Sequence, residues 1–591
     1  MIVRIRHLFA RIASLSLGLR IVILLVCILH VIGISWGLPS SDAWDNDGVA
    51  PRDFLPGIAQ TYTPSEYFTY PPFHLALLAL LTAPWTILAS VRAGSTRVPA
   101  VLAEILKPSY MTAFSYTARI VTVLMSLGIV VALALIAEEI SPPDRRRRVG
   151  VATAIVVAMG GPFTYYSHTS NLDVPMLFWA SLSALALVRG IARKEPRRIR
   201  SALLFATFSI ATKDQGYAMF FAGIPLALCT WLVLDEWARR SLGRIAKDVL
   251  IGGAIALVLL LFIDGAITNP SGFKARLGFL SGSASQDFAT YTKDWSGRAS
   301  ILRDTARELG RHYPPWRLWP YAVIFAAGPF ATIAAARKQA RAVFAASFVP
   351  LLFALSFTVF FNMVARRVEE RFMLPQVLFL GVYAGYALER CFFPPGRGAW
   401  VVVRWLSRAV CVIMVYRAFF DVVELDTNLL HDPRYGAEAY LAKHAQPGDT
   451  VEVHGLNVYL QRFSDLPAGV RVARVGNTPA NTRGPVPGVE EVQAPLMGVE
   501  QRRPRFIVVS ECFVWRYLKR DLGPQQGRII PPTQNRDAAD ADATQFFQSL
   551  FDGKLAYHHA HESRYESDIF LRAFMHASVG CTVWTFERNG P

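Results

Sequence analysis

The chain has 591 residues, 53% of them hydrophobic, and a formal net charge of +17. It is too long for one ordinary domain, and its apolar content is typical of a membrane protein. The positive charge does not indicate nucleic-acid binding, because the arginines cluster in short segments between apolar runs and the sequence holds no RNA- or DNA-binding module. The six cysteines follow no metal-binding pattern.

The first predicted element is a membrane helix over residues 19–38, which follows a basic amino-terminal segment. It is long enough to cross about 30 Å of hydrocarbon. The run is longer than the apolar part of a usual signal peptide and no cleavage site is obvious, so we expect a retained anchor.

An acidic loop follows this helix. Its charged residues between positions 42 and 53 are Asp42, Asp45, Asp47, Arg52 and Asp53. Asp45 and Asp47 could hold a divalent cation, Mg²⁺ or Mn²⁺, or act as general base on an acceptor hydroxyl, in a loop fixed by Trp44. The alternative is a solvated turn, because "DNDG" at 45–48 is also favourable turn chemistry.

The basic clusters predict the topology, because the positive-inside bias keeps them cytoplasmic. These clusters are 144–148, 193–200, 239–247, 337–341 and 389–398. An even number of crossings must separate successive clusters, so pairs of helices should meet outside near 165–173, 211–217, 268–316 and 362–372. With 19–38, 117–137 and a last crossing over 400–423, about eleven transmembrane helices result, with the amino end inside and the carboxyl end outside.

Residues 73–90 are also apolar, but an additional crossing before 144 would break the even count. Pro84 interrupts this run, and Pro71 and Pro72 precede it. We therefore expect the segment to lie in the membrane interface.

The residues after the last crossing should form a soluble domain. Apolar alternation at 450–460, 505–511 and 580–587 predicts strands, and 436–445 predicts a helix. The expected division is a transmembrane domain over 1–423, with large outer loops at 38–116 and 268–316, and an extracytoplasmic α/β domain over 424–591. Cys512 and Cys581 either form a disulfide there or remain free thiols.

Four helix ends on the predicted outer face carry candidate binding residues. Asp173 opens a helix, where a carboxylate also offsets the helix dipole. Lys213, beside Asp214, is either a salt-bridged cap or a phosphate contact. Arg371 begins a helix, an unfavourable position for a cation unless an anion is near. His168 is either a structural hydrogen-bonding residue or a ligand.

The order of several motifs resembles the GT-C membrane glycosyltransferases, in particular protein O-mannosyltransferase and aminoarabinose-transferase relatives. After the acidic loop come "YPPFHLALLAL" (70–80), "SNLDVPMLFW" (170–179), "ATKDQGYAMF" (211–220), "ERFMLPQVLFL" (370–380) and "DPRYGAEAYL" (432–441). The fold this implies is a mostly α, polytopic GT-C helix bundle with a carboxyl-terminal soluble α/β domain in a bacterial-type inner membrane.

The resemblance also implies the activity, a hexosyl or pentosyl transfer from a polyprenyl-phosphate donor to a protein, lipid or glycan acceptor, with inversion. The catalytic acidic residue falls on Asp47 first, with Asp45 and Asp42 behind it, although "DNDG" stands where such families carry "DE". Lys213 and Arg371 match positions that contact the lipid phosphate.

Two other functions remain open from the sequence. One is a transporter or flippase of a lipid-linked sugar; such proteins show repeats and midplane charges, whereas here the charges gather at helix ends. The other is a catalytically decayed GT-C scaffold, which the missing "DE" pair would permit.

Overall fold

The computed structural model describes residues 15–40, 44, 48–49, 54–64, 70–282, 289–313, 319–394, 401–476, 486, 488–518, 541–565 and 579–590. Contacts divide the chain into two compact units. The first consists of Met1–Ile32, Leu55–Leu78 and Arg119–Val423, and the second of Gly33–Phe54, Ala79–Ala118 and Glu424–Pro591. The division into domains at 1–423 and 424–591 stays a prediction.

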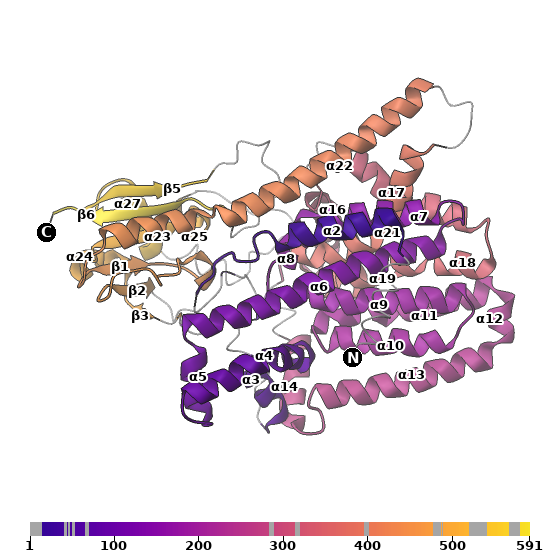
Figure 1. Cartoon of the computed structure of the whole chain (residues 1–591), viewed down its shortest axis with the longest axis horizontal. Helices are drawn as coiled ribbons and strands as arrows, with labels where there is room; N and C mark the ends of the chain where they lie inside the picture. Colours follow the sequence, from indigo (N-terminus) through magenta and orange to yellow (C-terminus); the bar gives the residue numbers. More distant parts are fainter. Residues whose placement is uncertain are drawn as a thin grey trace. The chain divides into compact units, whose positions relative to one another are not determined.

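The described residues as far as 430 are mostly helical (Figure 1). The helices are α2 (Leu17–Val31), α3 (Phe54–Tyr62), α4 (Pro72–Arg92), α5 (Val98–Ile105), α6 (Pro108–Ile140), α7 (Arg146–Ala158), α8 (Gly161–Ser167), α9 (Asp173–Ala192), α10 (Arg197–Ile210), η2 (Asp214–Gly216), α11 (Tyr217–Leu234), α12 (Glu236–Arg240), α13 (Leu242–Ile263), α14 (Pro270–Ser281), α16 (Trp295–Arg311), α17 (Trp319–Ala336), α18 (Arg341–Ala346), α19 (Val349–Phe357), η3 (Thr358–Asn362), α20 (Met363–Ala365), η4 (Glu370–Met373), α21 (Leu374–Phe392) and α22 (Val401–Leu430).

Among the described residues, seven helices are long and apolar enough to span a membrane, or eight if the bent pair α7 and α8 forms one span. The chain is therefore a multi-pass membrane protein, and the number of eleven crossings stays a prediction. The first predicted helix is shorter than expected: α2 ends at Val31 rather than at 38. Gly33 and Gly37, both with positive φ, turn the chain away from the helix.

The predicted break at Pro84 is wrong, because α4 runs without interruption through this proline. By length and apolarity α4 is one of the seven candidate spans. A proline removes one backbone hydrogen bond, which need not end a helix that is apolar enough to pack or to lie in lipid. Whether α4 crosses the membrane or lies in its interface stays a prediction.

Helix α21 is the most buried candidate span of the first unit, with 94% of its apolar window inside the protein. It packs on α7, α17 and α19, while α9 packs on α10 and α11 on α19. Gly385 permits the close contact between α21 and α7, because an added Cβ there would overlap Thr153. The segment before α21, which includes Arg371, therefore rests on a rigid helix.

The second unit contains a six-stranded sheet in the order β3-β2-β1-β4-β6-β5. Its strands are β1 (Thr450–Val453), β2 (Arg471–Gly476), β3 (Val489–Gln493), β4 (Phe506–Ser510), β5 (Tyr557–Ser563) and β6 (Val583–Arg588). The first four are parallel, and β6 runs antiparallel to both β4 and β5.

Helices cover the two faces of this sheet (Figure 1). On one face, α23 (Pro433–His444) packs its Leu441 against Val451 and Phe506. On the other, α25 (Glu511–Leu518) and α27 (Ala541–Phe551) pack against Ile507 and Val509. The predicted fold class, a mostly helical membrane chain with a carboxyl-terminal α/β region, is confirmed.

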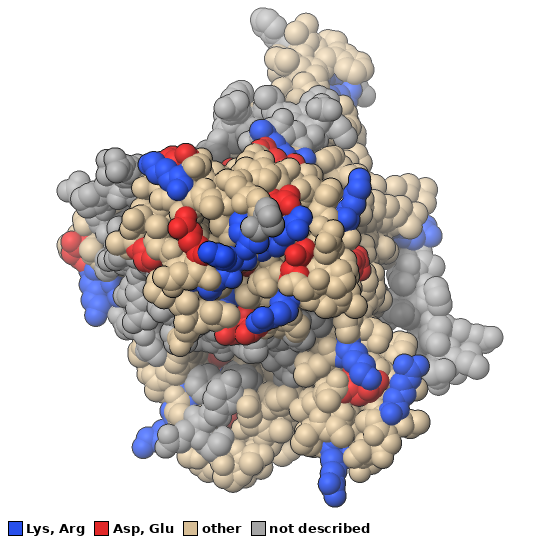
Figure 2. Space-filling model, turned by 90° about the vertical axis from the view of Figure 1, so that its left-hand side faces the viewer, with Lys and Arg blue, Asp and Glu red and all other residues tan. Residues whose placement is uncertain are grey.

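The charge at the surface is mixed. Figure 2 shows Lys and Arg side chains interspersed with Asp and Glu side chains, and no continuous basic patch among the described residues on that face. Exposed ion pairs of the second unit include Arg471–Glu490 and Lys554–Asp552. Exposed pairs of this kind contribute little stability.

Candidate functional site

A buried ion pair joins two of the predicted site residues in the first unit. Nζ of Lys213 lies 2.6 Å from Oδ1 of Asp173, and the two side chains are 7% and 2% exposed. Asp173 is the first residue of α9, and its amide donates to the side chain of Asn171. Lys213 is the extended residue that precedes η2 and α11. Two helix starts thus hold the pair together.

Arg371 interacts electrostatically with this pair, and we call Asp173, Lys213 and Arg371 the charged cluster. It lies in η4, immediately before α21, where its guanidinium is 3.3 Å from Oε2 of Glu369 and 4.7 Å from the centroid of the Phe372 ring. Burial lowers the pKa of Lys213, Asp173 opposes this shift, and the positive charge of Arg371 lowers the pKa further. The two predicted phosphate contacts, Lys213 and Arg371, are therefore electrostatic neighbours.

Tyr70 is a further electrostatic neighbour of this cluster. Desolvation raises the pKa of its phenol, Arg371 lowers it, and Asp173 and Asp214 raise it, while the residue as a whole is 41% exposed. The start of α4 is fixed nearby, because the amide of Phe73 donates to the carbonyl of Ala211 at 3.1 Å. Tyr70 was not among the predicted site residues; its only signal was its place in the "TYPPFH" motif.

The geometry of the cluster suits an anion. Asp173, the Lys213 turn and Arg371 lie at the starts of α9, α11 and α21, and helix amino ends carry positive partial charge. Oδ2 of Asp173 accepts no hydrogen bond within the described part of the chain. A phosphate would offset the two cations, and a hydroxyl could donate to the remaining carboxylate oxygen.

Asp214, another of the predicted site residues, has a different partner. It forms an ion pair with the buried guanidinium of Arg276 on α14, and Nη1 of Arg276 also lies 3.3 Å from Oδ1 of Asp264. Burial raises the pKa of Asp264 to about 6, although Arg276 lowers it. Asp214 therefore ties α14 to the turn that carries Lys213.

Asp264 and Arg276 were missed by the sequence analysis. The one available signal was a lone carboxylate at the end of the apolar run that contains α13. Its arginine partner follows 12 residues later, inside the predicted outer loop 268–316, and only the tertiary structure pairs them.

His168 lies between two backbone carbonyls. Its Nδ1 is 2.7 Å from the oxygen of Thr164, and its Nε2 is 3.0 Å from the oxygen of Leu29. Both ring nitrogens are occupied, which fits the structural alternative for this residue. The ring ties α8 to α2 and has no nitrogen left for a substrate.

The aspartates of the acidic loop, Asp42, Asp45, Asp47 and Asp53, lie outside the described residues. Trp44 is described, and it is 1% exposed in the second unit. The guanidinium of Arg434 lies 3.8 Å from the centroid of the Trp44 ring. Trp44 is thus a packing residue that anchors the loop rather than an exposed sugar platform.

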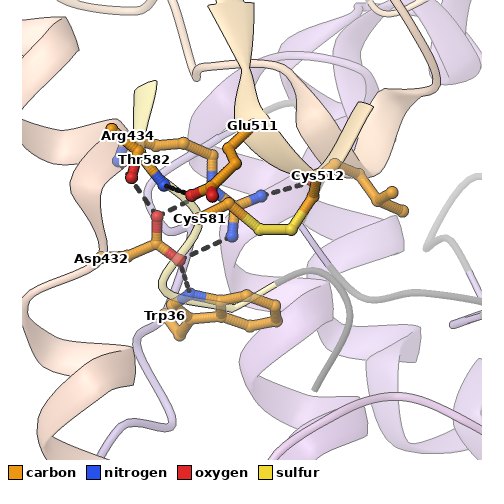
Figure 3. Close-up of a disulfide and its surroundings, with 8 residues drawn as sticks. Trp36, Asp432, Arg434, Glu511, Cys512, Cys581 and Thr582 are labelled. Carbon is orange, nitrogen blue, oxygen red and sulfur yellow. Dashed lines mark hydrogen bonds and ion pairs between the residues drawn. A yellow bond between two sulfur atoms is a disulfide. The ribbon is translucent and has the colours of Figure 1, made fainter. Parts of the chain in front are cut away.

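A network at the start of α23 completes this anchor (Figure 3). The indole Nε1 of Trp36 donates to Oδ2 of Asp432 at 3.0 Å, and Asp432 also pairs with Arg434 at 2.7 Å. Arg462 donates to the carbonyl of Leu38 at 2.8 Å. The segment before Trp44 in the sequence is thereby connected to the α/β fold. We call Trp36, Trp44, Asp432 and Arg434 the loop anchor.

A disulfide lies beside the loop anchor (Figure 3). Cys512 in α25 is bonded to Cys581, with the two Cα atoms 5.7 Å apart. Next to it, the backbone amide of Glu511 donates to the carbonyl of Thr582, and the amide of Thr582 donates to the Glu511 carboxylate at 3.1 Å. Of the two alternatives left open by the sequence, the structure has the disulfide.

No group of three or more His, Cys, Asp or Glu side chains within the described ranges is arranged to hold a metal ion. The predicted ligands, Asp45 and Asp47, lie outside those ranges. A Mg²⁺ or Mn²⁺ ion in the acidic loop stays a prediction.

Comparison with known proteins relates the part of the chain that holds Asp173 and Lys213 to a family. Residues 111–263, which contain Asp173 and Lys213, match the family described as dolichyl-phosphate-mannose-protein mannosyltransferase. The match covers this segment alone, and over it confirms the resemblance to protein O-mannosyltransferases seen in the motifs. No curated protein sequence matches the chain.

Solved structures are similar to most of the chain. ArnT from Cupriavidus metallidurans, solved bound to undecaprenyl phosphate and in the apo state, is 16% identical with a TM-score of 0.46, over 86% of this chain and 96% of that one. An Archaeoglobus fulgidus oligosaccharyltransferase tethered with an acceptor peptide is 12% identical with a TM-score of 0.43, over 92% of this chain and 80% of that one.

Proposed function

Starting from this family match, we propose that the protein transfers a sugar from a polyprenyl-phosphate donor to an acceptor hydroxyl on the extracytoplasmic side of the membrane, with inversion. The observation that carries the proposal is the buried cluster of Lys213, Asp173 and Arg371 at three helix starts. Asp173 and Glu369 already pair with the two cations, and a lipid phosphate, the anion that a membrane substrate would bring, would share these cations with them.

The cluster stabilises the leaving group in the proposed reaction. As the bond between the anomeric carbon and the phosphate oxygen breaks, negative charge grows on the phosphate. Fixed cations aimed at that charge lower the barrier, and a water-poor site strengthens the effect. Lys213, held by Asp173, and Arg371, held by Glu369, are oriented before the substrate arrives.

A carboxylate of the acidic loop activates the acceptor. Asp47, with Asp45 and Asp42 as the next candidates, takes the hydroxyl proton while the acceptor oxygen forms its bond to the anomeric carbon. The electron pair of the broken bond leaves with the phosphate, so a single displacement inverts the anomeric configuration. The loop anchor at Trp44 and Arg434 would limit the movement of this loop.

The proposed orientation places the amino end in the cytoplasm and the α/β domain outside a bacterial-type plasma membrane. It rests on the basic clusters between helices, which stay cytoplasmic under the positive-inside bias. Labelling of single cysteines introduced at exposed sites such as Arg244 and Lys554 tests it. The proposal requires protection of position 244 and labelling of position 554 in intact cells.

A transfer assay tests the activity. Purified protein is incubated with synthetic polyprenyl-phosphate-linked hexoses or pentoses and with protein, lipid or glycan acceptors. The rates of the Asp47→Asn and Asp45→Asn variants are compared with the rate of wild type. Asp53→Asn is the matched control from the same loop. Transfer at wild-type rates in both variants would remove the assignment of these aspartates to catalysis. Translocation of the lipid-linked sugar without transfer, measured in proteoliposomes, would favour a transporter.

A further inference from the structure

A large apolar cavity lies in the first unit, away from the charged cluster. Its volume is about 770 Å³, and its walls come from α2, α7, α21 and α22, including Leu25, Ile155, Phe392 and Val412. Ligand pockets in proteins typically enclose about 300–1,000 Å³. The cavity is therefore large enough for hydrocarbon chains.

The cavity has one charged end. Arg147 and Arg148 from the start of α7 line it together with Glu389 near the end of α21. The buried Glu389 carboxylate is 2.9 Å from Nη1 of Arg145 and 3.2 Å from Nε of Arg148. Of the charged residues that line the cavity, two are arginines and one is a carboxylate, so this end carries net positive charge.

This end lies far from the proposed transfer site. Arg371 precedes α21 and Glu389 lies in its last turns, within one span that runs from Glu370 to Phe392. At 1.5 Å per residue, the two positions are about 27 Å apart along the helix. The cavity therefore opens its charged end toward the opposite membrane surface from Lys213 and Arg371.

We propose that this cavity binds an anionic glycerophospholipid, with its acyl chains between α2 and α22 and its phosphate on Arg147 and Arg148. The apolar walls match the chains, and the net positive end matches the headgroup. Basic side chains near a membrane surface each contribute about 1 kcal/mol toward anionic lipid. The site is independent of the proposed transferase activity, because it shares no residue with the charged cluster.

Native mass spectrometry of the full chain, with phosphatidylglycerol and phosphatidylcholine titrated separately, tests this proposal. Wild type should retain phosphatidylglycerol at about tenfold lower concentration than phosphatidylcholine. Arg147→Gln combined with Arg148→Gln should remove most of this preference. Arg147→Gln alone should remove part of it while leaving the Arg148–Glu389 pair intact. The exposed pair Arg244→Gln and Lys247→Gln on α13 is the matched control and should change nothing.

A cavity-filling variant separates the cavity from surface charge. Val412 lines the cavity and is 55% exposed, so Val412→Trp can occupy the space without disturbing the protein core. This variant should reduce retention of both lipids at least tenfold. Equal retention of the two lipids by wild type, or unchanged retention in Val412→Trp, would overturn the proposal. Displacement of phosphatidylglycerol by an equal concentration of polyprenyl phosphate would overturn the assignment to a glycerophospholipid.

Discussion

The ammonium nitrogen of Lys213 lies 2.6 Å from Oδ1 of Asp173, and both side chains are almost completely buried. Removing two charges from water carries a desolvation cost that their attraction often fails to repay. A pair in this position is therefore weak evidence of a stabilising role and better evidence of a binding role. The distinction can be measured, because stability and activity respond differently to single and double substitutions.

Lys213→Met should destabilise the protein by about 3–5 kcal/mol, because it leaves the Asp173 carboxylate buried without its partner. Adding Asp173→Asn to this variant should recover most of the lost stability, since no uncompensated charge then remains. Transfer activity should stay at least a hundredfold below wild type in the double variant, because the phosphate contact is absent. Thermal unfolding in detergent and initial transfer rates measure the two effects.

The exposed pair Arg240 and Glu236, four residues apart on α12, provides the matched double-substitution control. Replacing both should leave stability and rate unchanged, as expected for a surface pair. Wild-type rates in the Lys213→Met, Asp173→Asn protein would show that the buried pair has only a structural role.

Arg434→Lys should slow transfer without weakening donor binding. Lysine keeps the charge beside Asp432 but loses the guanidinium plane that lies over Trp44, so the acidic loop should be held less firmly. We expect kcat to fall about tenfold while KM for the donor stays within twofold. Arg471→Lys, at an exposed pair with Glu490, is the control. A change in donor KM with unchanged kcat would contradict the positioning role.

Replacing Cys512 and Cys581 by serine should lower the stability of the α/β fold by about 2–4 kcal/mol. The bond joins residues 69 positions apart, so its loss releases a long loop in the unfolded chain. Denaturant unfolding of the full chain, followed by proteolysis within the α/β domain, measures the change. Cys229→Ser, at an exposed free cysteine, should have no effect. Equal midpoints for the double-serine protein and wild type would refute the prediction.

His454 should make the α/β fold sensitive to mild acid. Burial lowers the pKa of this imidazole, Glu452 at 3.5 Å and the Val475 carbonyl raise it, and Arg502 lowers it. Since the folded pKa is below the unfolded value of about 6.5, the unfolded chain takes up the proton first. The stabilisation is therefore present above pH 6.5 and is lost as the pH falls below it.

Amide exchange in β1 and β2, corrected for intrinsic rates, measures this loss between pH 7.5 and pH 5.5. The opening free energy of wild type should decrease by up to about 1.4 kcal/mol per pH unit, and His454→Gln should flatten this dependence. His444→Gln, at an exposed histidine, should leave it unchanged. An identical slope in His454→Gln would contradict the role of this side chain.

The sequence could predict what depends on local pattern. Alternating apolar residues located β1, β4 and β6, and apolar length located most of the spans. It placed the end of the first helix too late, because residues 32–38 are apolar but belong to a glycine-containing turn fixed by Trp36 and Asp432. That contact joins residues 396 positions apart, which no local pattern reveals.

The candidate site also contains residues whose place could be predicted from the sequence and residues whose place could not. Charges at helix ends predicted the neighbourhood of Asp173, Lys213 and Arg371, because all three lie where helices begin. The partner of Asp214 could not be predicted, since Arg276 lies on a separate helix, α14. Likewise, the sequence left open whether His168 is a structural residue or a ligand, and only tertiary contacts show it between two carbonyls. The contact of Trp44 with Arg434 is also tertiary.

The most direct measurement of the central claim is the affinity of the full chain for polyprenyl phosphate relative to the uncharged polyprenol. A site built from Lys213 and Arg371 should bind the phosphate at least a hundredfold more tightly in wild type, since hydrogen bonds to charged groups contribute about 1.5–3 kcal/mol each. Arg371→Gln, and Lys213→Met in the Asp173→Asn protein, should each remove at least tenfold of this preference. The double variant Arg147→Gln, Arg148→Gln should leave this preference for the phosphate unchanged. Undiminished discrimination between phosphate and alcohol in both cluster variants would contradict the account.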